Sequence, residues 1–185
     1  FNNAQSGGGI LSWLGCHYID LVAYVLGEDI VQVSGTVDTL SGEDIDVEDV
    51  ASLTFRFANG ALGSMQAGYH LAVSGAGYMG PSYDTYMGFR GQLGRVFWEP
   101  TKAPPELHVE SVANGWKTAP QRSSTYGLPQ VDAYGGAHGL AFIDDFIKAI
   151  QGEGEPPTTG EDALKVARIV EAVYESSETG KRIDL

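Results

Sequence analysis

The first twenty residues place one histidine and one carboxylate in an apolar stretch that follows three glycines, GGGILSWLGCHYID at positions 7–20. At ~100° per residue, a helix there puts four side chains on one face: Trp13, His17, Asp20 and Tyr24. His17 and Asp20 are three positions apart, so the carboxylate can orient the imidazole and raise its affinity for a proton. Such a pair suits general acid and base catalysis on a hydroxyl or carbonyl group.

Both features have simpler interpretations. His17 can be a core histidine bonded to a backbone carbonyl. The glycines, Gly8 and Gly9 among them, can form an ordinary loop, or they can let the backbone approach a ligand or a second domain because they lack Cβ atoms. They do not form GxGxxG after a strand, which disfavours a phosphate-binding loop. The four histidines show neither HxxxH nor HExxH spacing, so we expect no metal site.

The composition of the chain limits its binding partners and its cellular compartment. The formal net charge is −13 with 11 basic residues, which argues against a nucleic-acid or anionic-membrane partner. The single cysteine, Cys16, excludes an internal disulfide and favours a reducing compartment such as the cytoplasm, with the thiol packed and inert. Polar residues interrupt the apolar stretch after Gly7, so we expect no membrane span and no signal peptide. The acidic run at 42–46 is expected to be a solvated surface.

The candidate residues must be positioned by helices and strands. The sequence predicts one α+β domain over residues 1–185, a mostly antiparallel open sheet with helices packed on one face. A helix is expected over 10–26, ending at Gly27, and a strand over 30–40. Hairpins are expected to turn at Asn59–Gly60, near 91–94 and at Asn114–Gly115.

Two helices are expected near the end of the chain. The first has an apolar stripe, and the second runs from about Glu161 to Thr179 and is closed by Gly180. The stripe comprises Ala141, Phe142, Phe146, Ile147 and Ile150.

Two segments, 72–82 and 119–136, match no element, and loops that long are usually functional or disordered. They carry Tyr78 and Tyr126, together with Ser124, Tyr134 and the nearby Tyr83. These side chains are expected either to line a pocket for a polyhydroxylated ligand or to be solvated or oligomer contacts.

Three stretches resemble a known family: GGGILSWLGCHYIDLVAYVLGEDIVQVSG, EDVASLTFRFANGALGSM and GEDALKVARIVEAVYESSETGKRIDL. In this order they are similar to the C-terminal domain of the glucose-fructose oxidoreductase and inositol dehydrogenase (Gfo/Idh/MocA) family. The resemblance implies an enzyme of two domains, with NAD or NADP bound mainly by an N-terminal Rossmann domain. That domain, with its E-K-P lysine, is missing here, so the chain alone is expected to be inactive.

The resemblance also implies roles for residues of the first helix. His17 matches the family histidine that exchanges a proton with the substrate hydroxyl, Gly8 and Gly9 would border the cofactor, and Asp20 would assist His17. The family carries an Asp four residues before this histidine, where this sequence has Trp13. An indole cannot accept a proton, although Trp13 can stack on a sugar ring or a nicotinamide.

Three functions follow as hypotheses. The first is a substrate-binding and oligomerisation domain of an NAD(P)-dependent oxidoreductase acting on a sugar, cyclitol or related hydroxyl compound. The second is a non-catalytic binding or assembly module, which Trp13 favours. The third is a metal-free lyase or isomerase that uses His17 and Asp20. A sheet covered on one face, with Val50 and Leu62 on its other face, predicts a homodimer or homotetramer.

Overall fold

A computed structural model describes residues 2–69, 85–99, 104–127, 129 and 131–185. The chain divides into two compact units, Phe1–Leu71 with Thr158–Leu185, and Ala72–Pro157. The described strands are all antiparallel and form two four-stranded sheets, β3-β2-β1-β8 and β4-β5-β6-β7. The predicted α+β class is therefore confirmed, with the strands divided between two sheets.

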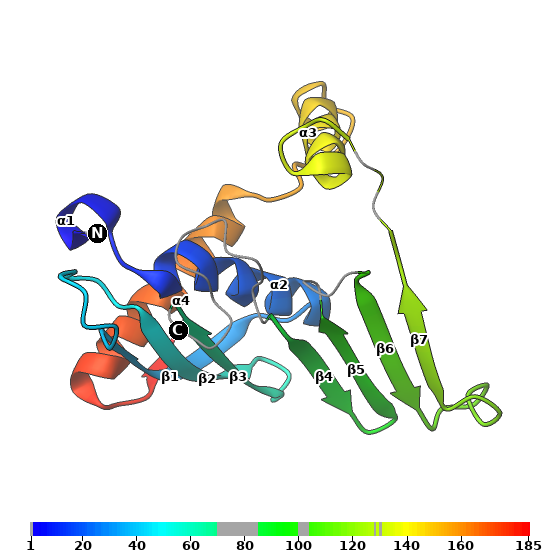
Figure 1. Ribbon diagram of the computed structural model, residues 1–185, viewed down its shortest axis with the longest axis horizontal. Helices are drawn as coiled ribbons and strands as arrows, with labels where there is room; N and C mark the ends of the chain where they lie inside the picture. Colours follow the sequence, from blue (N-terminus) through cyan, green and yellow to red (C-terminus); the bar gives the residue numbers. More distant parts are fainter. Residues whose placement is uncertain (1, 70–84, 100–103, 128, 130) are drawn as a thin grey trace. The chain divides into compact units, whose positions relative to one another are not determined.

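The first unit contains the helix expected over 10–26 in two parts, preceded by a short helix that was not expected (Figure 1). A short helix, α1 (Asn3–Ser6), leads through the glycines to a π-helical turn, η1 (Leu11–Gly15), and then to α2 (Cys16–Leu26). The helix ends at Gly27, whose φ of 64° is left-handed, as the sequence predicts. The π turn was not predicted, and it matters for the site because it changes which side chains share a face.

The sheet of this unit comprises β1 (Ile30–Asp38), β2 (Val50–Phe57), β3 (Leu62–Gly68) and β8 (Ile183–Asp184). The predicted hairpin turns at Asn59–Gly60, where Gly60 has a φ of 88°. Phe55 lies opposite Gly63, and a Cβ at Gly63 would lie 2.0 Å from the Phe55 ring. The missing side chain therefore gives the aromatic ring its place over the neighbouring strand.

The core of the unit forms where α4 (Gly160–Thr179) packs on β1 (Figure 1). It is made of apolar side chains from η1, α2, α4 and alternate positions of β2, among them Leu11, Ile19, Leu53, Phe57 and Val173. Thr159 caps α4 in a capping box with Asp162, and Gly180 ends the helix. The predicted limits of this helix are confirmed to within one residue.

The C-terminal end of α4 also closes the open edge of β1. β8 pairs only with Gln32 and Val33, which leaves the next amides of β1 without a neighbouring strand. The hydroxyl of Ser176 accepts from the Gly35 N–H at 3.0 Å and donates to the Lys181 carbonyl at 2.6 Å. The hydroxyl of Ser177 accepts from the Val37 N–H at 3.0 Å. Two adjacent serines thus satisfy an edge that would otherwise be exposed.

One segment, Asn3–Leu26, is long and apolar enough by length and composition to cross a membrane, with a mean hydropathy of 1.4. The sequence interpretation expected none. The segment is interrupted at the glycines, and Leu11 and Ile19 are both 0% exposed in the core of the first unit. Only 22% of the apolar window is buried, but insertion in a bilayer would remove both side chains from that core, so we interpret the segment as a helix that packs on the first unit by one side.

The second unit contains β4 (Met87–Gly91), β5 (Gly94–Glu99), β6 (Glu106–Ser111), β7 (Gln121–Thr125) and the helix α3 (Gly136–Ile150). The hairpin at 91–94 is confirmed. The hairpin predicted at Asn114–Gly115 is wrong in its second strand, because β7 begins only at Gln121. The intervening residues form consecutive turns, and the Arg122 guanidinium stacks over the Trp116 ring at 3.6 Å.

Two further expectations concern this unit. β7 lies inside the segment 119–136 that matched no element. The apolar stripe of α3 is present but open to solvent: Phe142, Phe146, Ile147 and Ile150 are 46 to 71% exposed. The segment 72–82 lies outside the described residues.

We expect Ser176→Ala to lower the free energy of unfolding by about 1–3 kcal/mol, because the Gly35 N–H and the Lys181 carbonyl both lose their partner. Denaturant unfolding followed by circular dichroism measures this change. Ser64→Ala, at an exposed position of β3, is the matched control and should change stability by less than about 0.5 kcal/mol. Equal effects of the two substitutions would contradict the edge-closing role.

Candidate functional site

A hollow of about 450 Å³ in the first unit brings together the start of α2 and one side of α4. His17, Asp20, Ser12 and Cys16 come from the first helix, and Glu171 from α4. The wall opposite the histidine is apolar and is formed by Ala163, Val166, Ala167 and Val170. Thr158 also lines the hollow, which therefore offers one imidazole, two hydroxyls, one thiol and two carboxylates beside an apolar surface.

His17 is exposed, and among the described residues it has no hydrogen-bond or ion-pair partner. It is therefore not the packed core histidine of the simpler interpretation. Asp20 lines the same hollow, but no hydrogen bond or ion pair joins it to His17 within the described chain. The structure brings the two predicted groups to one site without pairing them. The catalytic role of both residues remains a prediction.

Trp13 does not line the hollow. It is 44% exposed, and Tyr24 is 82% exposed. The face predicted at ~100° per residue assumes a regular α-helix, whereas the Cys16 N–H bonds back to the Leu11 carbonyl across a π turn. This i→i+5 turn shifts the side chains that precede His17, so that Ser12 takes the place predicted for Trp13. π turns are rare in proteins overall, and those that do occur often lie at functional sites.

Burial raises the pKa of the Cys16 thiol, with its own and the His17 backbone amides opposing the shift. A raised pKa disfavours the thiolate, which is the reactive form of cysteine. This direction agrees with the packed, unreactive thiol that the sequence predicts.

The start of the helix is fixed by Glu48, a carboxylate that sequence reasoning missed. Its side chain is 8% exposed and accepts from the Gly9 N–H at 2.7 Å and from the Leu11 N–H at 3.0 Å. The Ile10 N–H donates to the Glu48 backbone carbonyl at 3.0 Å. An acidic side chain at a helix N-terminus is stabilised by the unpaired amides there. Glu48 adjoins an acidic run that is largely exposed and lies in the loop before β2, so no local signal in the sequence marked it as buried.

Gly8 and Gly9 are both required at the start of this helix, each by a different close contact. A Cβ at Gly9 would lie 1.8 Å from the Glu48 carbonyl oxygen. A Cβ at Gly8 would lie 2.3 Å from the Ser12 hydroxyl and 2.5 Å from the Tyr174 hydroxyl. The close approach that these glycines permit is thus to residues of this same unit. Their proposed place beside a cofactor stays a prediction.

Tyr174, on α4, links Glu48 to the hollow. Its hydroxyl donates to Glu48 Oε1 at 2.9 Å and lies 2.7 Å from Ser12 Oγ. Burial, together with the Glu48 carboxylate, raises the pKa of Tyr174 to about 12, against the opposing effect of the Ser12 hydroxyl. A chain of hydrogen bonds therefore runs from the buried carboxylate to a hydroxyl at the surface of the hollow.

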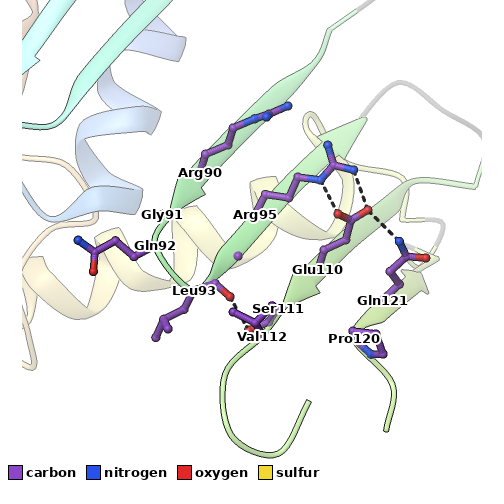
Figure 2. A pocket seen from close by; sticks show the side chains of 11 residues that line it. Arg90, Gly91, Gln92, Leu93, Arg95, Glu110, Ser111, Val112, Pro120 and Gln121 are labelled. Carbon is purple, nitrogen blue, oxygen red and sulfur yellow. Dashed lines mark hydrogen bonds and ion pairs between the residues drawn. The ribbon is translucent and has the colours of Figure 1, made fainter. Parts of the chain in front are cut away.

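The second unit has a hollow of its own, of about 440 Å³, at the β4–β5 turn (Figure 2). A polar row crosses the sheet there through Arg90, Arg95, Glu110 and Gln121. The Arg95 guanidinium binds Glu110 through two bonds of 2.6 and 2.7 Å, which raises the pKa of Arg95 and lowers that of Glu110. Arg95 and Glu110 neutralise each other, which leaves the charge of Arg90, and no histidine is among the described residues that line this hollow.

The remaining predicted residues lie elsewhere. Tyr126 is in the second unit, where its hydroxyl accepts from the Trp98 indole N–H at 2.6 Å. That bond uses the Tyr126 oxygen as an acceptor and leaves its O–H proton for another partner. Tyr78 and Tyr83 lie outside the described residues, and Tyr134 is fully exposed.

The whole chain matches one protein family. Residues 2–185 match the model described as the C-terminal alpha/beta domain of an oxidoreductase family, Gfo/Idh/MocA. The chain belongs to this family. The resemblance noted in the sequence is confirmed over nearly its full length.

Two curated relatives cover most of the chain. A myo-inositol 2-dehydrogenase of Thermotoga maritima is 27% identical over 183 residues, which are 96% of this chain and 49% of that protein. A D-apiose dehydrogenase of Rhizobium rhizogenes is 24% identical over 95% of this chain and 48% of its own length. This chain thus spans about half the length of the relatives it matches.

Solved structures show the same fold. A levoglucosan dehydrogenase in complex with NADH and levoglucosan superposes with a TM-score of 0.82 at 24% identity, covering 100% of this chain and 52% of its own. An aldose-aldose oxidoreductase from Caulobacter crescentus, complexed with glycerol, gives a TM-score of 0.75 at 22% identity, over 99% and 49% of the two chains.

We expect Gly9→Ala to lower the free energy of unfolding by about 3 kcal/mol, because the new methyl group meets backbone that cannot rotate away. Chemical denaturation measures the change. The matched control is Gly160→Ala in the first turn of α4, where no atom lies within 4 Å of the new Cβ; it should be neutral or stabilise by about 0.5 kcal/mol. Similar losses for both would contradict the contact with Glu48.

The raised pKa of Tyr174 predicts a pH-dependent contribution to stability. The folded state holds this proton more tightly than the unfolded state, so the contribution is complete below pH 10 and is lost as the pH rises towards about 12. The stability difference between the wild-type chain and Tyr174→Phe, measured by denaturation from pH 8 to pH 11.5, should therefore shift against the wild type above pH 10. A difference independent of pH would contradict the shift.

Proposed function

We propose that this chain is the substrate-binding and oligomerisation domain of an NAD(P)-dependent oxidoreductase that acts on a sugar, cyclitol or related hydroxyl compound. The observation that carries the proposal is His17, an exposed imidazole without a partner in the described chain, at a hollow with one apolar wall. An apolar wall suits the C–H face of a ring. The relatives named for myo-inositol, D-apiose and levoglucosan support this class of substrate.

The charge of the hollow supports the same class. Asp20 and Glu171 both line it, and neither has a basic partner among the described side chains. Two carboxylates disfavour a ligand that itself carries a carboxylate or phosphate. Hydroxyl groups, in contrast, can donate to carboxylates. A neutral polyhydroxylated ligand therefore fits the hollow best.

In the proposed reaction, His17 removes the proton from the substrate hydroxyl as the carbon loses a hydride and becomes a carbonyl. The nicotinamide supplies the hydride acceptor when NAD or NADP is bound. The Gly9 and Leu11 amides are already engaged by Glu48, so the glycine turn does not offer them to a phosphate. The residues present thus fit a domain that borders the nicotinamide while another domain holds most of the cofactor.

Two exposed surfaces support partners for this domain. The apolar stripe of α3 is open to solvent, and the relatives are about twice as long as this chain. We therefore propose that the chain works beside a dinucleotide-binding domain of the same gene product. The sheet face opposite α4 exposes Ser52, Thr54 and Arg56, with Leu62 72% exposed on β3, and we propose it as the homo-oligomer contact.

Trp13 favours a second function, a binding or assembly module without catalysis. The position that holds an acid in the family resemblance holds an indole, and its side chain is outside the hollow. On this alternative the full-length protein shows no turnover, and Trp13→Asp is the substitution expected to create it. Turnover by the unmodified protein excludes the alternative.

We expect His17→Ala in the full-length oxidoreductase to lower kcat/KM at least ~100-fold, the usual contribution of a positioned general base. NAD(P)H absorbance, recorded on a panel of sugars and cyclitols, measures the change. Tyr24→Phe on the same helix, at a side chain 82% exposed, serves as the control and should leave kcat/KM within about twofold. A kcat/KM that is unchanged in His17→Ala would exclude His17 as the base.

A further inference from the structure

The hydrogen-bond chain from Glu48 to the hollow has a fixed direction. An ionised carboxylate only accepts, and both Glu48 oxygens accept from backbone amides. The Tyr174 hydroxyl has one proton, and it donates this proton to Glu48 Oε1. The contact of 2.7 Å between Tyr174 and Ser12 must therefore use the Ser12 proton, with the Tyr174 oxygen as acceptor. The lone pairs of Ser12 Oγ remain for another donor.

Ser12 is placed to use those lone pairs on a ligand. It lines the hollow together with His17 and Asp20. A serine inside a helix usually bonds back to the carbonyl four residues earlier. Here the hydroxyl instead reaches across to α4, and the approach requires Gly8 to lack a Cβ. Tyr174, with its pKa near 12, keeps its proton at every pH used for assays, so the direction of the chain does not reverse.

We propose that Ser12 is a positioning residue of the sugar site, whose hydroxyl oxygen the Ser12–Tyr174–Glu48 chain holds as a hydrogen-bond acceptor for one substrate hydroxyl. This inference rests on the proposed function. The inference adds a rule of substrate selection to that function: the substituent that faces Ser12 must donate a hydrogen bond. A fluorine, an ether or a carbonyl at that position only accepts and leaves Ser12 without a partner.

The test compares hydroxyl with fluorine in the full-length oxidoreductase. The probes are myo-inositol and levoglucosan, each beside its set of monodeoxyfluoro analogues, because fluorine retains the size of the group and loses the donor. In the wild type, fluorine at one ring position should raise KM about 5- to 10-fold with kcat within about twofold. In Ser12→Ala, the parent sugar should have the 5- to 10-fold higher KM that the fluoro analogue has in the wild type. Fluorine at that ring position should then raise the KM of the variant by less than about twofold.

Further variants separate positioning from structural damage. Ser12→Thr keeps the hydroxyl and should restore the discrimination. Tyr174→Phe frees the Ser12 hydroxyl to rotate and should weaken the discrimination between hydroxyl and fluorine. Thr118→Ala, at an exposed turn of the second unit, is the control and should discriminate as the wild type does. Discrimination by Ser12→Ala equal to that of the wild type at every position would overturn the inference, as would an equal loss on all analogues.

A second measurement on the isolated chain decides the inference if neither probe is turned over by the wild type, a result that would itself contradict the proposed function on these sugars. The Ser12 hydroxyl proton should exchange slowly enough to be seen by proton NMR and should show a nuclear Overhauser effect to the Tyr174 ring. Tyr174→Phe should abolish the signal. Absence of the signal from the wild type, or its persistence in the variant, would overturn the proposed direction.

Discussion

The candidate site depends on one buried carboxylate. Glu48 holds the Gly9 and Leu11 amides, and through them the point at which the first helix starts. The start of the helix in turn decides where His17 and Asp20 emerge. Because helix amides at an N-terminus have no intrahelical acceptor, an anion that satisfies them fixes both position and direction. The hollow is therefore built around a contact that lies beneath it.

The same contact explains the glycines better than a phosphate loop does. Gly9 lies against the Glu48 backbone, and Gly8 lies against Ser12 and Tyr174. A side chain at Gly9 would separate the start of the helix from the loop that carries Glu48. Contact with backbone thus requires glycine at position 9, and a φ of 139° together with the two nearby hydroxyls requires it at position 8.

Helix α4 contributes to the fold and to the site with different residues. Val173 and Ser176 face the sheet, where they fill the core and close the edge of β1. Tyr174 and Glu171 face the first helix and the hollow. A single helix that contacts the sheet and the site therefore couples them physically, since moving α4 would shift both.

The sequence by itself determined the elements whose signals are local. Glycine positions fixed the ends at Gly27 and Gly180 and the turn at Gly60, and the alternation of Leu53, Phe55 and Phe57 fixed the buried face of β2. His17 and Asp20 were found as candidates from residue type and spacing. Only the tertiary structure decided which neighbours share their site. The π turn places Ser12 rather than Trp13 beside His17. The carboxylate that fixes the helix start, Glu48, is 39 positions from Gly9 in the sequence. Helical periodicity assumes a uniform repeat and contacts near in sequence, whereas these two features depend on packing between distant segments.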